Sequence, residues 1–115
     1  MNPSAVPAKV CRAGSAGYVD ALPGIRRKAM VDGVHTQLVE FKLAKGAVIP
    51  PHSHSQEQTG YLVSGHLIFT IAGVIHELHP GDSWAIPGGV EHGVRVPADS
   101  VVIEVFSPVR EDYRT

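Results

Sequence analysis

The sequence predicts an all-β fold, a sandwich or a barrel, and three observations support this. From Tyr18 onward, short apolar runs alternate with glycine and proline about every 8–12 residues, a spacing typical of such folds. No window of about a dozen residues shows the apolar stripe of an amphipathic helix. Three histidines and a glutamine, far apart in the chain, have spacings that suit a metal site only if the sheet curls to bring them together.

The expected strands follow one another with tight reversals between them. Residues 66–71 alternate with a period of two, and Ala72-Gly73 forms a plausible hairpin turn in which glycine supplies the positive φ. Residues 80–82 and 87–89 mark the next two reversals. Trp84 and Ile86 share a strand face that should pack in the core or in a dimer interface. We expect strands at residues 25–31, 36–43, 48–54, 60–63, 66–71, 74–78, 83–86, 92–96 and 101–106.

The length of 115 residues suits one domain, with residues 18–115 forming the barrel. Residues 1–17, rich in Ala, Pro, Ser and Gly, are expected to be a flexible N-terminal arm, or a strand ordered only against a partner subunit. This segment lacks the apolar stretch of a signal peptide, and no run approaches the roughly 20 apolar residues of a membrane helix. The tail at 108–113 has room for one helical turn at most.

Composition and charge point to an ordinary globular protein, at 43% hydrophobic and 18% charged residues. The formal charge of −1 is evenly spread, so neither a nucleic-acid partner nor a membrane partner is expected. The single cysteine, Cys11, excludes an intrachain disulfide framework and suits a reducing cytoplasm. A catalytic role for Cys11 has little support, because it lies in the expected arm.

The most informative residues are His52, His54, Gln58 and His92. His52 and His54 are two apart, which in an extended strand places both side chains on one face. Gln58 follows after a short connection, and His92 arrives from a distant strand after a turn. Imidazole is a good ligand for Zn, Fe, Ni, Cu and Mn, and a carboxamide oxygen is a harder, uncharged donor. These four residues are therefore the predicted ligands of a divalent metal ion.

A simpler interpretation must be weighed against this one, because seven histidines is well above typical usage for 115 residues. A lone H-x-H pair is often just two strand histidines. The ordered combination of H-x-H, a polar residue four positions on and a later P-x-G-x-x-H is far more specific. The other four histidines match no ligand spacing and are expected on solvent-facing strand positions or turns: His35, His66, His76 and His79.

The ligand set has a chemical consequence. Three imidazoles and one carboxamide leave the double charge of the ion uncompensated by the protein, so the ion should be a strong Lewis acid and should attract an anionic ligand. Four protein ligands on an ion that prefers five or six leave positions open for water or substrate. We therefore expect a small anionic substrate.

The same segments resemble the two cupin motifs. Gly46 to Gly65 is similar to the first, a glycine, five residues, H-x-H, a further ligand and a closing glycine; Gly81 to His92 is similar to the second. Two positions depart from the pattern, since the usual Glu ligand is Gln58 and the final asparagine is Val96. Glu57, one residue earlier, should point away by strand alternation. The resemblance implies a small antiparallel jelly-roll β-barrel of the RmlC-like type, usually a homodimer, with the metal in its mouth.

Segments outside the motifs are similar to one group of cupins. The beginning at 23–28, the run 57–61 and the end at 106–113 resemble the pectin-degradation cupins, in which the glutamine is a metal ligand. Those proteins convert 4,5-unsaturated uronates into linear ketouronates. The resemblance implies a non-redox isomerase or lyase-like enzyme acting on an unsaturated uronate or a related sugar acid or keto acid.

Glu104 is the first candidate catalytic residue. It shares one strand face with Val102 and Phe106, and an acidic residue among apolar neighbours is destabilising to bury without a purpose or a partner. One interpretation is a proton shuttle beside the metal. The other is a buried structural pair with an arginine such as Arg26 or Arg95. In the resembling family this position is an aspartate with a proposed catalytic role, and Glu104 is one methylene longer.

Arg110 is the second candidate, because it matches an arginine of the resembling family and could bind a substrate carboxylate through two hydrogen bonds. The alternative for Arg110 is a surface ion pair with Glu111 or Asp112. Two other functions remain open for the whole chain. A non-catalytic ligand-binding or sensor cupin would keep the metal ligands yet make Glu104 dispensable. An iron dioxygenase is disfavoured, since Gln58 provides no charge to stabilise a higher oxidation state of iron.

Overall fold

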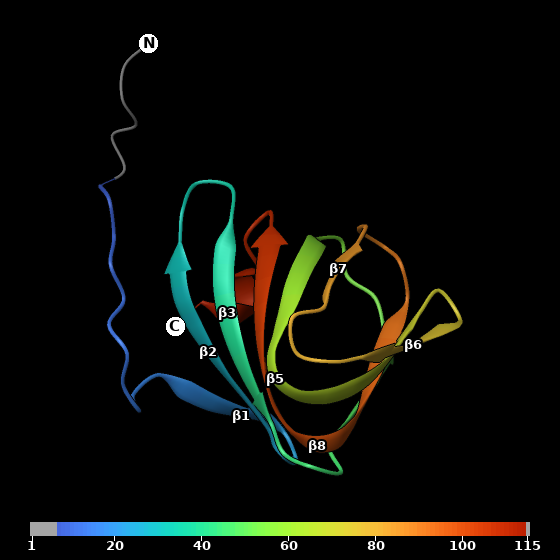
Figure 1. Ribbon diagram of the computed structural model, residues 1–115. Helices are drawn as coiled ribbons and strands as arrows, with labels where there is room; N and C mark the ends of the chain where they lie inside the picture. Colours follow the sequence, from blue (N-terminus) through green and yellow to red (C-terminus); the bar gives the residue numbers. More distant parts are fainter. Residues whose placement is uncertain (1–6, 115) are drawn as a thin grey trace.

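The computed structural model describes residues 7–114 and consists almost wholly of antiparallel β-sheet (Figure 1). The only helical element in this part of the chain is a short 3-10 turn, η1, which agrees with the single turn expected at the tail. The elements are β1 (Tyr18–Leu22), β2 (Ile25–Asp32), β3 (Gln37–Leu43), β4 (Val48–His52), β5 (Glu57–Ile71), β6 (Val74–Leu78), β7 (Ser83–Ile86), β8 (His92–Ser107) and η1 (Glu111–Tyr113).

Two long strands, β5 and β8, pair with each other and organise the fold. The C-terminal half of β8 also pairs with β3, which continues to β2 and β1, while its N-terminal half pairs with β4. In the same way, β5 pairs with β7 near its start and with β6 near its end. Each long strand therefore belongs to both walls of the structure, and the predicted jelly-roll fold is confirmed.

Both long strands bend where they pass from one wall to the other, and Figure 1 shows them curving through the bottom of the view. In β5 the bend lies at Gly65, whose φ of +99° is a backbone conformation that favours glycine. Opposite it, the Ser100 hydroxyl accepts a hydrogen bond from the His66 N–H (3.0 Å) and donates one to the Ala98 carbonyl (2.7 Å). The pairing of β5 with β8 shifts register around this point. At the bend, hydrogen bonds of the Ser100 hydroxyl thus replace regular bonds between the strands, and Gly65 adopts the backbone conformation that the bend requires.

The hydrophobic core fills the space between the two walls. Along β5 and β8 the inward residues alternate with exposed or half-buried ones, so Leu62, Leu67 and Phe69 from β5 meet Val94, Val96 and Val102 from β8. Trp84 and Ile86 are also buried, which places their shared face in the core. This alternation is the strand periodicity on which the sequence analysis depended.

The structure differs from the predicted strands in three respects. The strand predicted at 48–54 ends at His52, so His54 lies in the following loop. Residues 60–63 and 66–71 form one strand with 57–59, and 92–96 forms one strand with 101–106, because β5 and β8 bend without breaking. The strand β1 was missed, since it is a mostly exposed edge strand without a clear alternation. Gly24, with a φ of +76°, makes the tight reversal from β1 to β2. The Ala72-Gly73 hairpin is present, and both residues have positive φ.

The predicted N-terminal arm is described only in part, because residues 1–6 lie outside the described residues. Residues 7–17 precede β1 without helix or strand, and Lys9 forms an ion pair of 3.0 Å with Asp32 of β2. The arm's flexibility and the boundary at residue 18 stay predictions. Within residues 7–114, no helix has the length and apolar character needed to cross a membrane.

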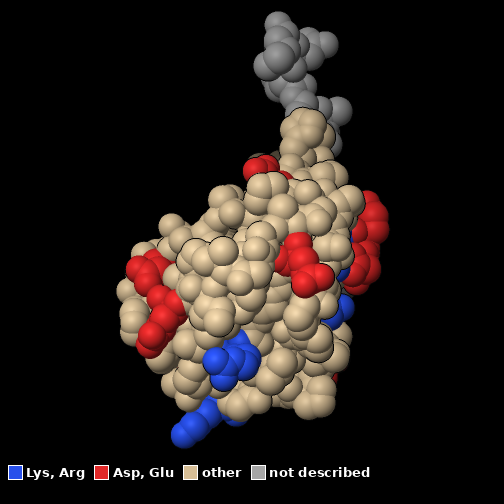
Figure 2. All heavy atoms as spheres, turned by 90° about the vertical axis from the view of Figure 1, so that its right-hand side faces the viewer, with Lys and Arg blue, Asp and Glu red and all other residues tan. Residues whose placement is uncertain are grey.

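Charged side chains are sparse on the face formed by β6 and β7. Figure 2 views the molecule from this side and shows lysine, arginine and acidic residues in small separate groups on a mostly uncharged surface. This pattern agrees with the near-zero formal charge of −1. The face offers no broad positive field, as far as its described residues show, so attraction of an anion would depend on local groups.

The bend at Gly65 provides a test of the fold. A Cβ added at Gly65 would lie 2.1 Å from the Ser100 hydroxyl oxygen and 2.4 Å from the Asp99 carbonyl oxygen. We therefore expect Gly65→Ala to lower the free energy of unfolding by about 3 kcal/mol or more. Gly73→Ala is the matched control, because Gly73 also has a positive φ (+79°) but open space around it, and should lose only about 1 kcal/mol. Urea denaturation measures both, and equal losses would contradict this account of the bend.

Candidate metal centre and cavity

Three of the predicted ligands meet at one end of the cavity between the walls. His52 ends β4 and lies opposite His92, the first residue of β8, while His54 follows in the loop after β4. The ring centroids are 4.4 Å apart for His52 and His92, 5.0 Å for His54 and His92, and 5.7 Å for His52 and His54. One nitrogen from each ring lies within 4.8 Å of the others. The structure thus brings together the histidines that the sequence grouped.

Each of these rings is held by the same backbone interaction. The Nδ1 atoms of His52, His54 and His92 face the carbonyl oxygens of residues 50, 56 and 90 at 3.0, 2.9 and 2.9 Å. A carbonyl oxygen can only accept, so each Nδ1 carries the hydrogen and donates it. The lone pair of each imidazole therefore remains on Nε2, which is the state needed for metal binding.

Burial keeps two of these rings neutral. Desolvation lowers the pKa of His54 and of His92, and the nearby positive charge of Arg110 contributes to the shift at His54. A neutral imidazole can bind a metal ion without first releasing a proton.

Gln58 completes the set from β5. The residue is only 5% exposed, and its side-chain Oε1 lies 2.8 Å from the Nε2 of His54. Because the hydrogen of His54 is on Nδ1, this contact brings two acceptors together without a proton between them. A shared cation would satisfy both atoms. The observed donor set therefore fits a divalent ion held by His52, His54, Gln58 and His92. Glu57, the neighbour of Gln58, is exposed, as expected from strand alternation.

Glu104 lies directly behind Gln58. The Trp84 indole N–H points at both oxygens of the Glu104 carboxyl, at 3.0 and 3.2 Å, and the side chain of Gln58 also hydrogen-bonds this carboxyl. Since a carboxylate accepts hydrogen bonds from the Gln58 amide nitrogen, Gln58 Oε1 is free to face the histidines. Burial raises the pKa of Glu104 to about 8, and the hydrogen bonds from Trp84 and Gln58 only partly oppose this shift.

The alternative of a buried pair between Glu104 and an arginine is wrong. The nearest acidic partner of Arg26 is Asp20, at 3.6 Å, and Arg95 is exposed on β8. The partner of Glu104 is instead Trp84, whose role in the site the sequence analysis missed. Gly60 permits the contact, because it lies opposite both Trp84 and Glu104 and an added Cβ would meet the indole nitrogen at 2.2 Å.

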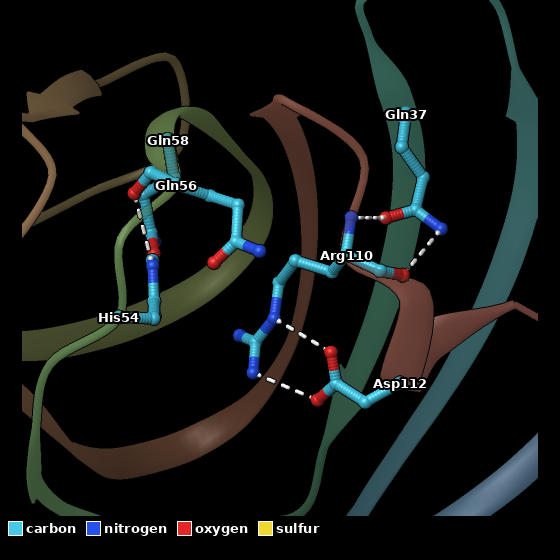
Figure 3. Close-up of polar contacts among 6 residues, drawn as sticks. All are labelled: Gln37, His54, Gln56, Gln58, Arg110 and Asp112. Carbon is cyan, nitrogen blue, oxygen red and sulfur yellow. Dashed lines mark hydrogen bonds and ion pairs between the residues drawn. The ribbon is translucent and has the colours of Figure 1, made fainter.

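Arg110 lies just before η1 and lines the same cavity. Its guanidinium binds both carboxylate oxygens of Asp112, at 3.4 and 3.0 Å (Figure 3). The guanidinium also lies over the rings of Phe106 (5.3 Å) and Tyr113 (3.9 Å). The ion pair with Asp112 was one of the two predicted alternatives, and the structure combines it with a position in the cavity wall. The side chain of Arg110 is largely buried, whereas that of Asp112 is exposed.

Gln37 fixes the position of Arg110 and was not singled out from the sequence. This buried residue at the start of β3 accepts a hydrogen bond from the Arg110 backbone N–H (3.0 Å) and donates one to its carbonyl (3.4 Å), as Figure 3 shows. A glutamine at a strand end gives no sequence signal of this role, because its partner is 73 residues away.

These residues surround one cavity that encloses about 500 Å³ of empty space, including solvent at its mouth. Its polar groups are His52, Gln58, His92, Glu104 and Arg110, and the remaining lining is mostly apolar or aromatic, including Phe106. An apolar cavity with a few convergent polar groups is the usual form of a small-molecule site. All six predicted metal-binding and catalytic residues therefore lie in or beside one cavity.

Comparison with known proteins places this chain in a family. Residues 39–107 match the family model described as "Cupin domain", and the chain belongs to the cupin family. KdgF from Halomonas sp. is 36% identical, with a TM-score of 0.81 over 84% of this chain and 92% of that chain. An RmlC-like cupin from Shewanella frigidimarina NCIMB 400 is 30% identical, with a TM-score of 0.86 over 93% and 97% of the two chains.

A third structure is similar in fold alone. Salicylate 1,2-dioxygenase from Pseudoaminobacter salicylatoxidans, solved with gentisate, is 15% identical, with a TM-score of 0.72 over 76% of this chain and 26% of that chain. The predicted resemblance to the cupins is confirmed by the domain match, and the resemblance to the pectin-degradation group is confirmed by the match to KdgF.

The raised pKa of Glu104 predicts how the stability of the metal-free protein depends on pH. Between the ordinary value of 4.5 and about 8, the folded protein holds a proton that the unfolded chain has lost, so stability falls as pH rises through this window. From pH 6.5 to 8.5 this group should remove about 2 kcal/mol of unfolding free energy. Denaturation of the chelator-treated protein measures the loss, and Glu104→Gln should abolish most of it. An identical pH dependence in the variant would contradict the assignment.

Proposed function

We propose that this protein is a metal-dependent cupin enzyme that opens the ring of an unsaturated uronate, or of a related sugar acid or keto acid, by non-redox isomerisation. The observation that carries the proposal is the buried Glu104 carboxyl, which touches the Gln58 ligand and faces the same cavity as Arg110. One small anion in the cavity could then reach an acid that holds a proton (Glu104), a metal-binding group (Gln58) and a cation (Arg110). The resemblance of the chain ends to the pectin-degradation cupins supports this choice of substrate, as does the 36% identity to KdgF.

The cofactor in this proposal is a divalent ion, Zn, Ni, Fe or Mn, held by His52, His54, Gln58 and His92. When bound, it would supply a Lewis acid that polarises an oxygen of the substrate. The Nδ1 hydrogen bonds orient the three imidazoles before any ion arrives, and Glu104 orients the Gln58 amide in the same way. Such groups behind the ligands commonly change metal affinity about 10–100-fold.

Arg110 is proposed to bind the carboxylate of the substrate. Its guanidinium already holds the carboxylate of Asp112 through two atoms, which demonstrates the geometry needed for a carboxylate. Asp112 is exposed and can give way to an incoming anion, while Gln37 keeps the backbone of Arg110 in place. When the substrate carboxylate replaces that of Asp112, the net charge of the ion pair with Arg110 does not change.

Glu104 is proposed to move the proton. Opening of a 4,5-unsaturated uronate adds a proton at C4, removes one from the hydroxyl at C1 and breaks the bond between C1 and the ring oxygen, so the composition does not change. Burial favours the protonated form of the Glu104 carboxyl and raises its pKa in the metal-free protein, and a carboxyl that has donated its proton can accept another in return. Trp84 and Gln58 fix its orientation, and the absence of a redox step agrees with a ligand set that lacks a negative charge.

The remaining expectations stay predictions. A sensor cupin would need the metal ligands but not Glu104, and an iron dioxygenase would need a ligand set that stabilises oxidised iron. A small anionic substrate, the absence of nucleic-acid and membrane partners, and a cytoplasmic location are expected as before. A homodimer is supported by the outer face of β5, where Tyr61 and Val63 are 49% and 47% exposed and Tyr61 lies opposite Ile103 of β8.

The metal assignment predicts a selective effect of histidine substitution. Elemental analysis of protein purified from cells should find about one divalent ion per chain fewer in His92→Ala than in wild type. His76→Ala is the matched control, because His76 is exposed on β6 and outside the cavity. The assignment fails if His92→Ala and His76→Ala have the same metal content per chain.

The catalytic assignment predicts a loss of activity at two positions. Activity on 4,5-unsaturated galacturonate is followed as loss of ultraviolet absorbance by the enol ether. Glu104→Gln should lower the rate constant about 10²–10⁴-fold. Arg110→Ala should mainly raise KM, because it removes a contact to the substrate carboxylate. The exposed Arg95 provides the control, Arg95→Ala, which should change neither. An unchanged rate constant for Glu104→Gln together with an unchanged KM for Arg110→Ala would overturn the mechanism even if the activity exists.

A further inference from the structure

A second cluster of ligand-type side chains lies on the hairpin formed by β5 and β6. In this hairpin Leu67 pairs with Leu78 and Ile68 with Glu77, so the next pair in the register is His66 with His79. Side chains that oppose each other across an antiparallel pair share a face, as do residues two apart in one strand. His66, His79 and Glu77 are therefore close together, although the sequence analysis expected both histidines to be isolated solvent-facing residues.

The atoms of this cluster converge. One ligand atom from each of His66, Glu77 and His79 lies within 4.8 Å of the other two. The rings of His66 and His79 stack, with centroids 4.9 Å apart and an interplanar angle of 24°. The Nε2 of His66 is 2.9 Å from a carboxylate oxygen of Glu77.

The Nε2 of His66 is the unusual atom of the cluster. It is shielded from solvent and has no hydrogen-bond partner, despite its short distance to Glu77, because that contact lacks the direction of a hydrogen bond. A buried nitrogen without a partner is destabilising. A metal ion differs from a proton here, since it can accept lone pairs from His66, His79 and Glu77 at the same time.

The backbone holds the two histidines in place. The N–H and carbonyl of His66 both contact the Ser100 hydroxyl, at 3.0 and 3.2 Å, and the His79 N–H donates to the Asp82 carboxylate at 2.8 Å. The ligand positions are thus fixed by the bend of β5 and by the turn before β7.

We propose that His66, Glu77 and His79 form a second metal site, for Zn²⁺, on the outer side of the β5–β6 hairpin. Two imidazole nitrogens and one carboxylate oxygen are zinc ligands, and the exposed side of the cluster leaves the fourth tetrahedral position to water. The site is separate from the cavity, because Leu67 and Phe69 line the cavity whereas His66 does not. In the described part of the chain β6 pairs only with β5, so a bound ion would tie this edge strand to its neighbour.

The experiment is a zinc titration of the metal-free, full-length protein by calorimetry. Wild type should bind two equivalents of Zn²⁺ at micromolar zinc, one at the cavity centre and one at the hairpin. His79→Ala should lose one equivalent or bind it at least about tenfold more weakly. His76→Ala removes an exposed histidine of the same strand from outside the cluster and should keep both equivalents. His92→Ala should lose the cavity equivalent and keep the one at the hairpin.

The outcomes separate the two sites. If His79→Ala binds zinc as wild type does, or if His76→Ala loses as much as His79→Ala, the hairpin site is overturned and the cluster is a simple His66–Glu77 ion pair. A wild type that binds a single equivalent removable by His92→Ala also overturns it. A wild type that binds a single equivalent, which His79→Ala loses and His92→Ala keeps, would contradict the proposed metal centre and leave the hairpin site standing. Urea denaturation of each variant confirms that the protein remains folded.

Discussion

The register between β5 and β8 is the constraint on which the rest of the structure depends. This single pairing places Gln58 opposite Phe106 and Gly60 opposite Glu104, and the same β8 places His92 opposite His52 of β4. A slip of β5 by one residue would turn Gln58 to the outer face, away from the face that Glu104 occupies, and bring Glu57 inward. The bend at Gly65 then lets each strand serve both walls, so residues far apart in the chain line one cavity.

The polar chain across this cavity explains how a carboxyl can be buried without a cation beside it. Trp84 donates to Glu104, and Glu104 in turn accepts from Gln58, whose oxygen faces His54. Each member fixes the orientation of the next, and the missing side chain at Gly60 gives the indole room to reach across. A carboxyl in this position favours its protonated form, because the surrounding apolar residues provide little solvation for the charge. The same burial that makes Glu104 destabilising at high pH suits it to transfer a proton near neutral pH.

Much of the fold and the metal centre could be predicted from the sequence, because the relevant signals are local. The H-x-H pair, the turn residues and the period-two alternation each depend on neighbours within a few positions. The sequence could not predict that β5 and β8 are continuous, nor that β1 is an edge strand. Bending and edge pairing depend on residues far away in the chain. For the same reason, the partners of Glu104 and Arg110 could not be predicted from the sequence. Trp84 and Gln37 act through contacts 20 and 73 residues away, for which a single sequence gives no indication. His66 and His79 likewise match no local ligand spacing and meet only through the hairpin register.

The central claim is that His52, His54 and His92 hold one cation through their Nε2 atoms and Gln58 holds it through Oε1. The backbone carbonyls occupy the Nδ1 atoms, and Glu104 occupies the amide nitrogen of Gln58. A crystal structure of the metal-loaded protein, with anomalous scattering to locate the ion, tests this most directly. The account predicts one ion about 2.0–2.1 Å from the Nε2 atoms of all three histidines, with the Gln58 Oε1 completing the set and the three Nδ1 hydrogen bonds intact. An ion bound through Nδ1, or a cavity that takes up no ion while its histidines turn apart, would contradict it.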